Sequence, residues 1–596
     1  MKTKSLLLAG VAMVAALASC SNDDVISMPD IPKNNLKIGY AKVAISMPTN
    51  GTRADEVFDA GTAAEAKVHE IHLAVYDEYG TFVGSGELIS DNTDGMGSPM
   101  GDPAGERGSD NVSDKYKKVF QLSLIEDANE PKQVVAFINT PLSNANLDEL
   151  TKANSERVVT SYFKGQGADA SEFAMTNAGY YDGSSNYVVA AQLETPVYAT
   201  AGEAIKAETA NTTIYVERLA AKVTVKKADV IEEELNYTIA DVSGAAVSLK
   251  FTPTLWGATG VAQSEYLVKT KFTSHTDWNA AANFRSYWAE GVNYGKEFAD
   301  YYNAETGKTT ELLSYVTFKD VDAYLKSAAS TPGVTEMGKS LYVPEHTSKL
   351  QLEDKDGAKY LVANTYSLIL GQYAVQSEEH GEWFKKNNEI DFYLLLAGVD
   401  DNGKKKYTIY NETQLMGVLL SYNGFNYVST SAEGTDAKAT RTKNNTDLLS
   451  LTQYFDLQYN AEVGKYMLVA KGTQKLYGAA TEDGEFTEIT VSEDMKSTNS
   501  RHYYYNNGMA YFNAAIAHDK GETATTYGVV RNHSYVLTIN KIENLGAPLD
   551  FNGHEGEDGT IEPDPIIPNP DELKDHFIQA TINVLSWHVK SNDVTL

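Results

Sequence analysis

Cys20 is the only cysteine in this chain of 596 residues, and this places the strongest constraint on its fold. No disulfide can form within the chain, so the burial of apolar surface has to supply its stability. A chain of this length can bury enough apolar surface to build two or more domains.

Cys20 directly follows a segment with the features of a secretory signal. A basic start precedes the apolar run Leu6 to Leu17, which is too short to cross a bilayer. Leu17-Ala18-Ser19-Cys20 then matches a bacterial lipobox, so we expect residues 1–19 to be removed and Cys20 to be acylated. The alternative is a structural cysteine after an ordinary signal peptide. An acylated Cys20 leaves no free thiol, which excludes cysteine chemistry and cysteine metal sites.

The charge of the chain restricts its partners. A formal net charge of −31 argues against binding nucleic acid or an anionic bilayer surface. No later segment is long and apolar enough for a transmembrane helix, so we expect a membrane contact only through the lipid anchor of an outer-membrane precursor. Ser21 to Asp24 resembles the acidic export signal of some Gram-negative surface lipoproteins, although a flexible tether is an equal alternative.

Arg53 is the first arginine of the chain and lies in a small, polar stretch of the kind that proteases cut. A strand is predicted before it, from Leu36 to Met47. Cleavage between Arg53 and Ala54 would release residues 20–53 as a lipidated propeptide and leave unpaired backbone groups behind. One face of this removable strand carries Ala41, Val43, Ile45 and Met47.

The remaining sequence predicts a mainly β fold. It contains 37 Tyr and 44 Gly but only 16 Pro, and alternating apolar residues recur throughout. Runs of strands with few short helices favour two antiparallel β-sandwiches, which we place at residues 54–230 and 231–550. The predicted strands include Ile71–Val75, Val134–Asn139, Thr213–Val225, Val247–Phe251, Asp391–Leu396, Lys406–Tyr410 and Tyr535–Ile542, and the predicted helices are Val321–Ala329, Asn444–Tyr454 and Asn506–His518.

Residues 551–596 are predicted to form a Pro-rich linker followed by a C-terminal strand from Phe577 to Val589. The strand changes phase midway, which indicates a bulge or a passage to another sheet or subunit. We interpret it as a donor strand that pairs with an open sheet edge. The alternative is that both end strands stay within their own domains. The donor-strand residues are Ile578, Ala580, Ile582, Val584, Leu585, Trp587 and Val589.

No catalytic motif occurs, so we expect neither an enzyme nor a cofactor. GxSxG, GxxxxGK[ST] and HExxH are absent. His69 and His72 are expected on opposite faces of a strand, which makes a poor metal pair, so no metal site is predicted. Asp91 to Gly95 lacks the distal Glu of a calcium loop. Tyr503 to Tyr505 are expected in a core, with a carbohydrate platform as the alternative.

Several short motifs follow one another in a specific order along the chain. They are the lipobox at Cys20, Arg53-Ala54, Val216–Val225, Leu255–Gly257, Tyr266–Lys269, Phe284–Ala289, Tyr342–Thr347 and Tyr527–Tyr535. Their order resembles that of the Mfa-type fimbrillins, the major shaft subunits of lipoprotein-derived type V pili. The resemblance implies two transthyretin-like β-sandwich domains, lipid-anchored export, cleavage by an arginine-specific, trypsin-like protease, and polymerisation by strand exchange.

The resemblance also implies partners and a location. The expected partners are copies of the chain itself, accessory anchor and tip subunits, the processing protease, and host or bacterial surface ligands. The precursor would be an outer-membrane lipoprotein and the product a cell-surface fimbrium that supports adhesion, biofilm formation and virulence. Two alternatives stay open, a monomeric surface lipoprotein that binds glycans and a tip or accessory subunit.

Overall fold

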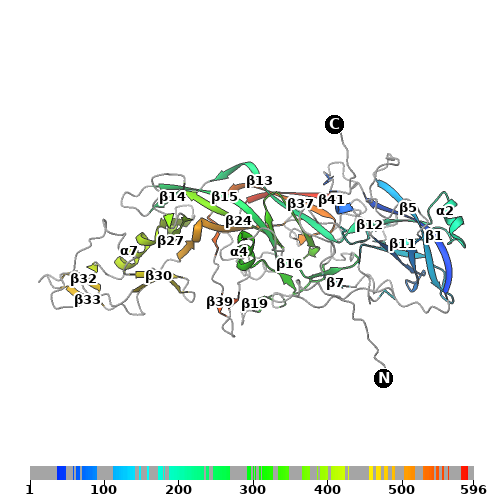
Figure 1. The fold of residues 1–596 in the computed structure, drawn as a ribbon, viewed down its shortest axis with the longest axis horizontal. Helices are drawn as coiled ribbons and strands as arrows, with labels where there is room; N and C mark the ends of the chain where they lie inside the picture. Colours follow the sequence, from blue (N-terminus) through cyan, green and yellow to red (C-terminus); the bar gives the residue numbers. More distant parts are fainter. Residues whose placement is uncertain are drawn as a thin grey trace, which may run out of the picture.

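The computed structural model of the protein consists mainly of β-strands, which confirms the predicted fold class (Figure 1). In the part of the chain that the structure describes, no helix is long and apolar enough to cross a membrane. The described residues are, with internal gaps, 36–48, 58–89, 112–148, 157–268, 291–347, 365–428, 455–489, 502–562 and 579–587.

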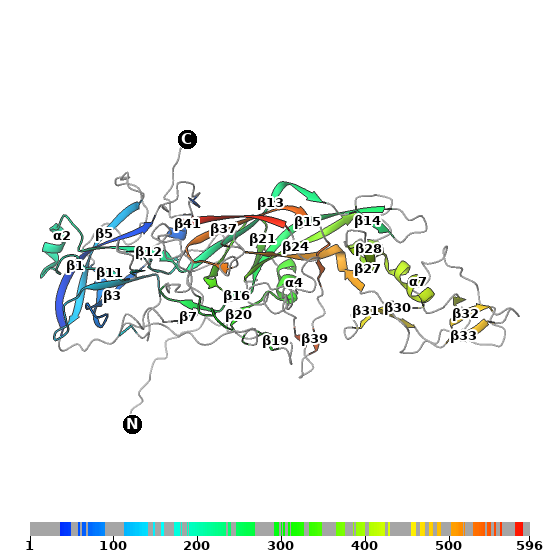
Figure 2. The same ribbon diagram turned by 180° about the vertical axis from the view of Figure 1, so that it is seen from behind.

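The N-terminal sheet lies at one end of the elongated molecule (Figures 1 and 2). Its strand order is β11-β6-β3-β4-β5-β1-β12-β8, and β6 also pairs with β8, so the sheet closes on itself. All of these pairs are antiparallel except β1 with β12. The strands are β1 (Leu36–Pro48), β3 (Ile71–Tyr76), β4 (Phe82–Leu88), β5 (Val112–Ile125), β6 (Gln133–Ile138), β8 (Met175–Asn177), β11 (Ala191–Gln192) and β12 (Thr212–Arg218).

The closed sheet encloses one apolar core, and a second apolar cluster covers part of its outer face. The inner core takes alternate residues from β1, β3, β5, β6 and β12. A second cluster covers the other face of β3 and β6, where Tyr76 and Phe137 pack with Leu219 and Leu267. Both faces of β6 are therefore buried, which explains why Val134 to Ile138 is a continuous apolar run rather than an alternating one.

Two further sheets face each other across the C-terminal core. The smaller has the order β2-β41-β37-β13-β22, and the larger has the order β34-β27-β28-β14-β15-β24-β35-β38. Their facing residues form one cluster that includes Val223, Tyr535 and Leu537 from the smaller sheet and Phe251 and Phe512 from the larger. This is a two-layer β-sandwich.

The smaller C-terminal sheet consists of β2 (Phe58–Asp59), β13 (Ala220–Glu233), β22 (Ser340–Pro344), β37 (His533–Ile542) and β41 (Gln579–Trp587). The larger consists of β14 (Asn236–Ile239), β15 (Ala246–Thr259), β24 (Tyr366–Val375), β27 (Phe392–Val399), β28 (Lys405–Tyr410), β34 (His502–Tyr505), β35 (Met509–Ala515) and β38 (Ala547–Pro548), with β21 (Val334–Glu336) paired to β15 beside this path.

Thr213 to Val225 is not the single strand that its apolar pattern predicted. The structure divides it into β12 and β13, which belong to different sheets. The break falls at Leu219, whose side chain is buried against the outer cluster of the N-terminal sheet. The domain boundary placed at residue 230 stays a prediction, and the change of sheet lies between Arg218 and Ala220.

The predicted helices have mixed outcomes. Helix α4 (Phe318–Lys326) overlaps the first of them. The second, Asn444–Tyr454, lies outside the described residues. The third, Asn506–His518, was wrong, because after a short 3-10 turn these residues form the sheet strand β35. Ala510, Phe512 and Ala514 alternate into the C-terminal core, and this packing outweighs the local helical pattern.

Candidate functional site

The strand before Arg53 occupies an interior place in the N-terminal sheet. β1 runs antiparallel to β5, from Leu36 opposite Ile125 to Pro48 opposite Val112. Its second half also runs parallel to β12, with Val43 opposite Thr212. The only parallel pairing of this sheet in the described residues is therefore made by the strand that the sequence predicts to be removable.

The predicted inward residues of β1 are buried. Ala41, Val43 and Ile45 are at most 1 % exposed and join the inner core with residues of β5 and β12, among them Phe120 and Ile214. Burial of a Val or Ile side chain stabilises a fold by about 1.5–3 kcal/mol. Met47 lies in β1 after a register shift, but its side chain is outside the described residues. The strand is thus a structural part of the core of this domain.

The first half of β1 has different partners on the side where β12 does not reach. Tyr40 and Tyr198 exchange two backbone hydrogen bonds of 2.8 and 2.7 Å. The Lys42 N–H donates to Asn211 Oδ1 at 2.7 Å, and the Asn211 N–H donates to the Lys42 carbonyl at 2.7 Å. Loss of β1 would leave these backbone groups without partners.

Lys42 also reaches the end of a helix. Its ammonium donates to the carbonyls of Ile205 at 3.2 Å and Ala207 at 2.6 Å, at the C-terminus of α2 (Ala201–Lys206). A cation at this end of a helix satisfies carbonyls that have no partner within the helix. Both faces of β1 are therefore bound to the rest of the N-terminal domain.

The residues after the predicted cleavage site are held at the junction of the two domains. Arg53 and Ala54 lie outside the described residues, as does Cys20. Glu65 is fully buried, and its carboxylate is 3.0 Å from Lys222 Nζ and accepts a hydrogen bond of 2.5 Å from the Tyr342 hydroxyl. Its carbonyl accepts from Arg218 Nε at 3.1 Å. Glu65 therefore links β12, β13 and β22.

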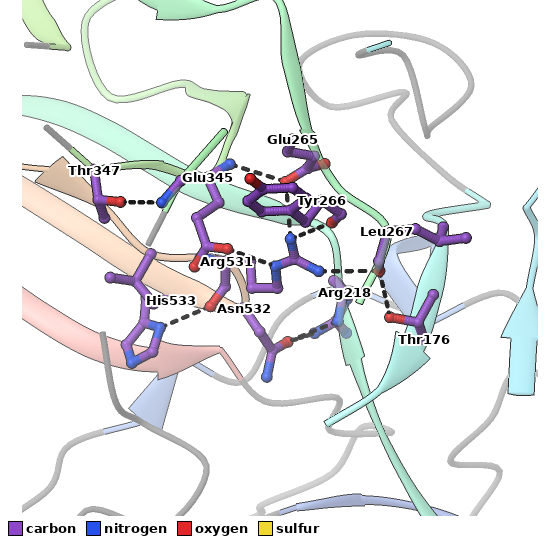
Figure 3. Close-up of polar contacts among 12 residues, drawn as sticks. Thr176, Arg218, Glu265, Tyr266, Leu267, Glu345, Thr347, Arg531, Asn532 and His533 are labelled. Atoms are coloured by element: carbon purple, nitrogen blue, oxygen red, sulfur yellow. Dashed lines mark hydrogen bonds and ion pairs between the residues drawn. The ribbon is translucent and has the colours of Figure 1, made fainter. Parts of the chain in front are cut away.

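A second buried network surrounds Arg531 at the same junction (Figure 3). The Arg531 Nε donates to Glu345 at 3.0 Å, Nη1 donates to the Leu267 carbonyl at 3.2 Å, and Nη2 lies 3.7 Å from Glu265. Burial raises the pKa of Glu265 to about 8, although the positive charge of Arg531 opposes this rise. Burial lowers the pKa of Arg531, but the negative charges of nearby carboxylates, Glu345 foremost, outweigh this effect and raise the pKa above its ordinary value.

Asn532 connects this network to the N-terminal sheet. It has a left-handed backbone (φ 58°), a conformation that asparagine tolerates better than most residues. Its side-chain oxygen accepts from Arg218 Nη1 at 3.2 Å, while its N–H donates to the Ala220 carbonyl at 2.9 Å. In the sequence, residues 531–533 and 345 stand out only as parts of longer motifs. Glu65 and Glu265 could not be identified from it, since a charged residue in a polar stretch gives no signal that it is buried.

The C-terminal strand β41 lies in the sheet of its own chain. It pairs antiparallel with β37, where Ala580, Ile582 and Val584 stand opposite Ile539, Leu537 and Tyr535. Its last residues, Ser586 and Trp587, pair parallel with Phe58 and Asp59 of β2. Ile578 and Val589 lie outside the described residues. The donor role of this strand stays a prediction.

The remaining candidate residues are Tyr503 to Tyr505, the two histidines and the acidic loop. Tyr505 is buried, stacks on Phe392 at 4.6 Å between ring centroids, and donates to the Gly546 carbonyl at 2.8 Å. His72 lies beside Glu70, while His69 and the Asp91 to Gly95 loop are outside the described residues. Within the described part of the chain, no group of His, Asp or Glu side chains could hold a metal ion.

Residues 503–593 match a known family, described as the major fimbrial subunit protein type IV, fimbrillin, C-terminal. The matched stretch contains β35, β37 and β41, and it confirms the resemblance to fimbrillins that the motifs indicated. No curated protein matches the chain.

Solved structures similar to the chain include two cell adhesion proteins, described as putative, from Parabacteroides distasonis. One has 9 % identity and a TM-score of 0.34 and covers 93 % of this chain and 99 % of its own. The other has 10 % identity and a TM-score of 0.32 and covers 92 % and 99 %. The tip fimbrial protein Mfa3 of Porphyromonas gingivalis, truncated at its C-terminus, has 8 % identity and a TM-score of 0.28 and covers 92 % and 100 %.

Proposed function

We propose, on the premise of the fimbrillin match at residues 503–593, that this chain is a structural shaft subunit of a surface fimbria. The subunit is exported as a lipoprotein acylated at Cys20, is cut after Arg53 by an arginine-specific protease, and polymerises by donor-strand exchange. The role is structural rather than enzymatic. The observation that carries the proposal is the place of β1, a strand interior to the N-terminal sheet that precedes the cut.

Cleavage changes what holds β1 in the sheet. In the precursor, β1 is covalently joined to the rest of the chain through the segment that contains Arg53. After the cut it is held only by non-covalent contacts. These are its backbone bonds to β5 and β12, the burial of its inward residues, and the hydrogen bonds of Tyr40 and Lys42 described above. Its departure opens a groove with unpaired backbone groups on both sides and an apolar floor, which favours entry of another strand.

The C-terminal strand supports the proposal by its sequence. Ala580-Thr581-Ile582-Asn583-Val584 repeats the alternation of Ala41-Lys42-Val43-Ala44-Ile45, with β-branched residues at the same steps. The Pro-rich residues between the body and this strand are predicted from the sequence to supply an extended connection. To act in another subunit, the strand has to exchange its pairing with β37 for a place between β5 and β12.

The test is polymerisation of the purified precursor after treatment with an arginine-specific protease. We expect filaments and a ladder of oligomers in unheated detergent. A chain that lacks Phe577 to Leu596 should not polymerise, and Val584→Asp should weaken polymerisation because it buries an unpaired carboxylate. Since β41 pairs with β37, the deletion is also expected to lower the melting temperature of the precursor.

A peptide that spans residues 577–596 distinguishes the loss of the donor strand from damage to the fold. Added to the cut, truncated protein, it should raise the melting temperature more than in the uncut, truncated protein, because β1 still fills the groove of the latter and only the place beside β37 is vacant there. The matched control is the same peptide with Val584→Asp. Filaments from the truncated protein alone, or equal effects of the two peptides, would contradict the proposal.

A further inference from the structure

We propose that the incoming strand has a single register, in which Ala580 takes the place of Ala41, Ile582 that of Val43, and Val584 that of Ile45. The proposal rests on the function proposed above and names the residues by which the groove recognises a second copy of this chain.

The inward positions of β1 increase in size along the strand. They run from Gly39 through Ala41 and Val43 to Ile45, and all four are buried. The groove is narrow at the Gly39 end, where a Cβ atom would lie 3.2 Å from Val197 Cγ2 and 3.6 Å from Leu124 Cδ1. A well-packed site of this shape tolerates strands of matching volume and resists larger side chains.

One alignment of the C-terminal sequence places its small inward residue at the position of Ala41 and β-branched residues at those of Val43 and Ile45, although these two follow in the reverse order of size. Among the alternating residues Ile578, Ala580, Ile582 and Val584, only Ala580 is small. A shift by two residues in either direction places an isoleucine at the position of Ala41. A shift by one residue turns Thr581 and Asn583 toward the core, which costs free energy because their polar groups lose water.

The same alignment sets where the inward contacts begin. It places Ile578 at the position of Gly39, where even a Cβ atom would lie 3.2 Å from Val197 Cγ2, so an isoleucine fits there only if Val197 shifts. We therefore expect the first inward contact of the inserted strand at Ala580. The outward residues also differ, because Thr581 replaces Lys42 and supplies no ammonium to the carbonyls of Ile205 and Ala207.

A cysteine pair measures the register directly. Asn583 would replace Ala44, which stands opposite Thr213 of β12. Neighbouring strands lie about 4.8 Å apart, which is within the 4.4–6.8 Å range for the Cα atoms of a disulfide. A shift of two residues increases this separation to about 8 Å, which is too far for a disulfide. Cleavage after Arg53 removes the only native cysteine, so the introduced thiols are the only ones in the polymer.

The experiment polymerises the protease-cut Asn583→Cys/Thr213→Cys variant, oxidises it and resolves it in denaturing, non-reducing gels. We expect covalent ladders from this pair and none from Thr581→Cys/Thr213→Cys or Leu585→Cys/Thr213→Cys. The control Asn583→Cys/Val536→Cys should instead cross-link within the uncut monomer, where these residues are opposite each other.

A gain-of-stability variant tests the same register without thiols. Thr581→Lys places an ammonium where Lys42 caps α2, so its filaments should dissociate at a higher temperature than the unsubstituted ones. Asn583→Lys, two residues further along, should give no such rise. Ladders from a shifted cysteine pair, or a rise only with Asn583→Lys, would overturn the register while leaving strand exchange intact. Absence of any polymer from the unsubstituted cut protein would overturn both proposals.

Discussion

Ile45→Ala should destabilise the precursor but leave the finished polymer unchanged. Ile45 is fully buried in the inner core of the N-terminal sheet, between β5 and β12. Truncation of a buried isoleucine to alanine costs about 2–5 kcal/mol, depending on how far the site collapses. For a domain of about 150–250 residues this lowers the melting temperature by about 4–20 °C, at about 2–4 °C per kcal/mol.

The assay compares thermal melts of the uncut precursor with the dissociation temperature of filaments made from it. In the proposed mechanism the polymer formed after cleavage no longer contains Ile45. Filaments from the variant and from the unsubstituted protein should therefore dissociate at the same temperature. The variant should also polymerise sooner, because β1 leaves its groove more readily. Ile38→Ala is the matched control on the same strand, since Ile38 is 42 % exposed and surface changes usually alter stability by about 0.5 kcal/mol or less.

Two results would refute this reasoning. An unchanged melt of the Ile45→Ala precursor would mean that β1 contributes nothing to the core. Filaments that are weakened as much as the precursor would mean that β1 stays in the polymer.

Three further predictions address the precursor. Cys20→Ser should abolish labelling with palmitate and remove the protein from the outer membrane, and labelling at the normal level would contradict the lipobox. Arg53→Ala should remain a monomer with residues 36–48 still attached, as measured by mass spectrometry and electron microscopy; normal fibres that retain this strand would exclude cleavage as the trigger. The raised pKa of Glu265 means that the folded state holds its proton more tightly than the unfolded state, so stability should fall by a few kcal/mol between about pH 4.5 and pH 8. Glu265→Gln should remove this part of the pH dependence in denaturant titrations, and an unchanged profile would place the proton elsewhere.

The alternation of apolar residues predicted individual strands well. Ile71–Val75 and Tyr535–Ile542 correspond closely to β3 and β37, and the inward face of the first strand was identified at Ala41, Val43 and Ile45. These features are local, since the side chains of a strand alternate between its two faces.

Pairing between distant strands could not be predicted in the same way. Nothing in the pattern of β1 indicates that its second half runs parallel to β12, or that β6 closes the sheet onto β8. The break at Leu219 was missed because the apolar pattern continues through it, although the two halves enter different sheets. Glu65 and Glu265 were missed because their burial depends on partners far away in the sequence, such as Tyr342 and Arg531.

The same stretch of chain connects the two places where strands would be exchanged. β12 lines the groove occupied by β1, and β13, one residue later, runs parallel to β37, on which β41 lies. In the proposed polymer, residues 212–233 therefore join the sheet that receives one donor strand to the sheet that carries the next. The break at Leu219 is therefore the point about which one domain would tilt against the other.

The buried charges lie at this point. A hydrogen bond from Arg218 to Asn532 lies beside the break, and next to it Arg531 donates a hydrogen bond to Glu345. A buried ion pair costs desolvation and is weak evidence for stability, since apolar residues of similar size often stabilise as much. Its hydrogen bonds, however, demand one geometry, whereas apolar side chains accept several. We infer that the network fixes the angle between the two domains of a subunit. Loss of Arg531 alone would leave the buried carboxylate of Glu345 without its partner, so the test replaces both residues. Arg531→Met/Glu345→Leu should change the straightness of the filaments more than their yield, measured by electron microscopy, and straight filaments from this double variant would contradict the role.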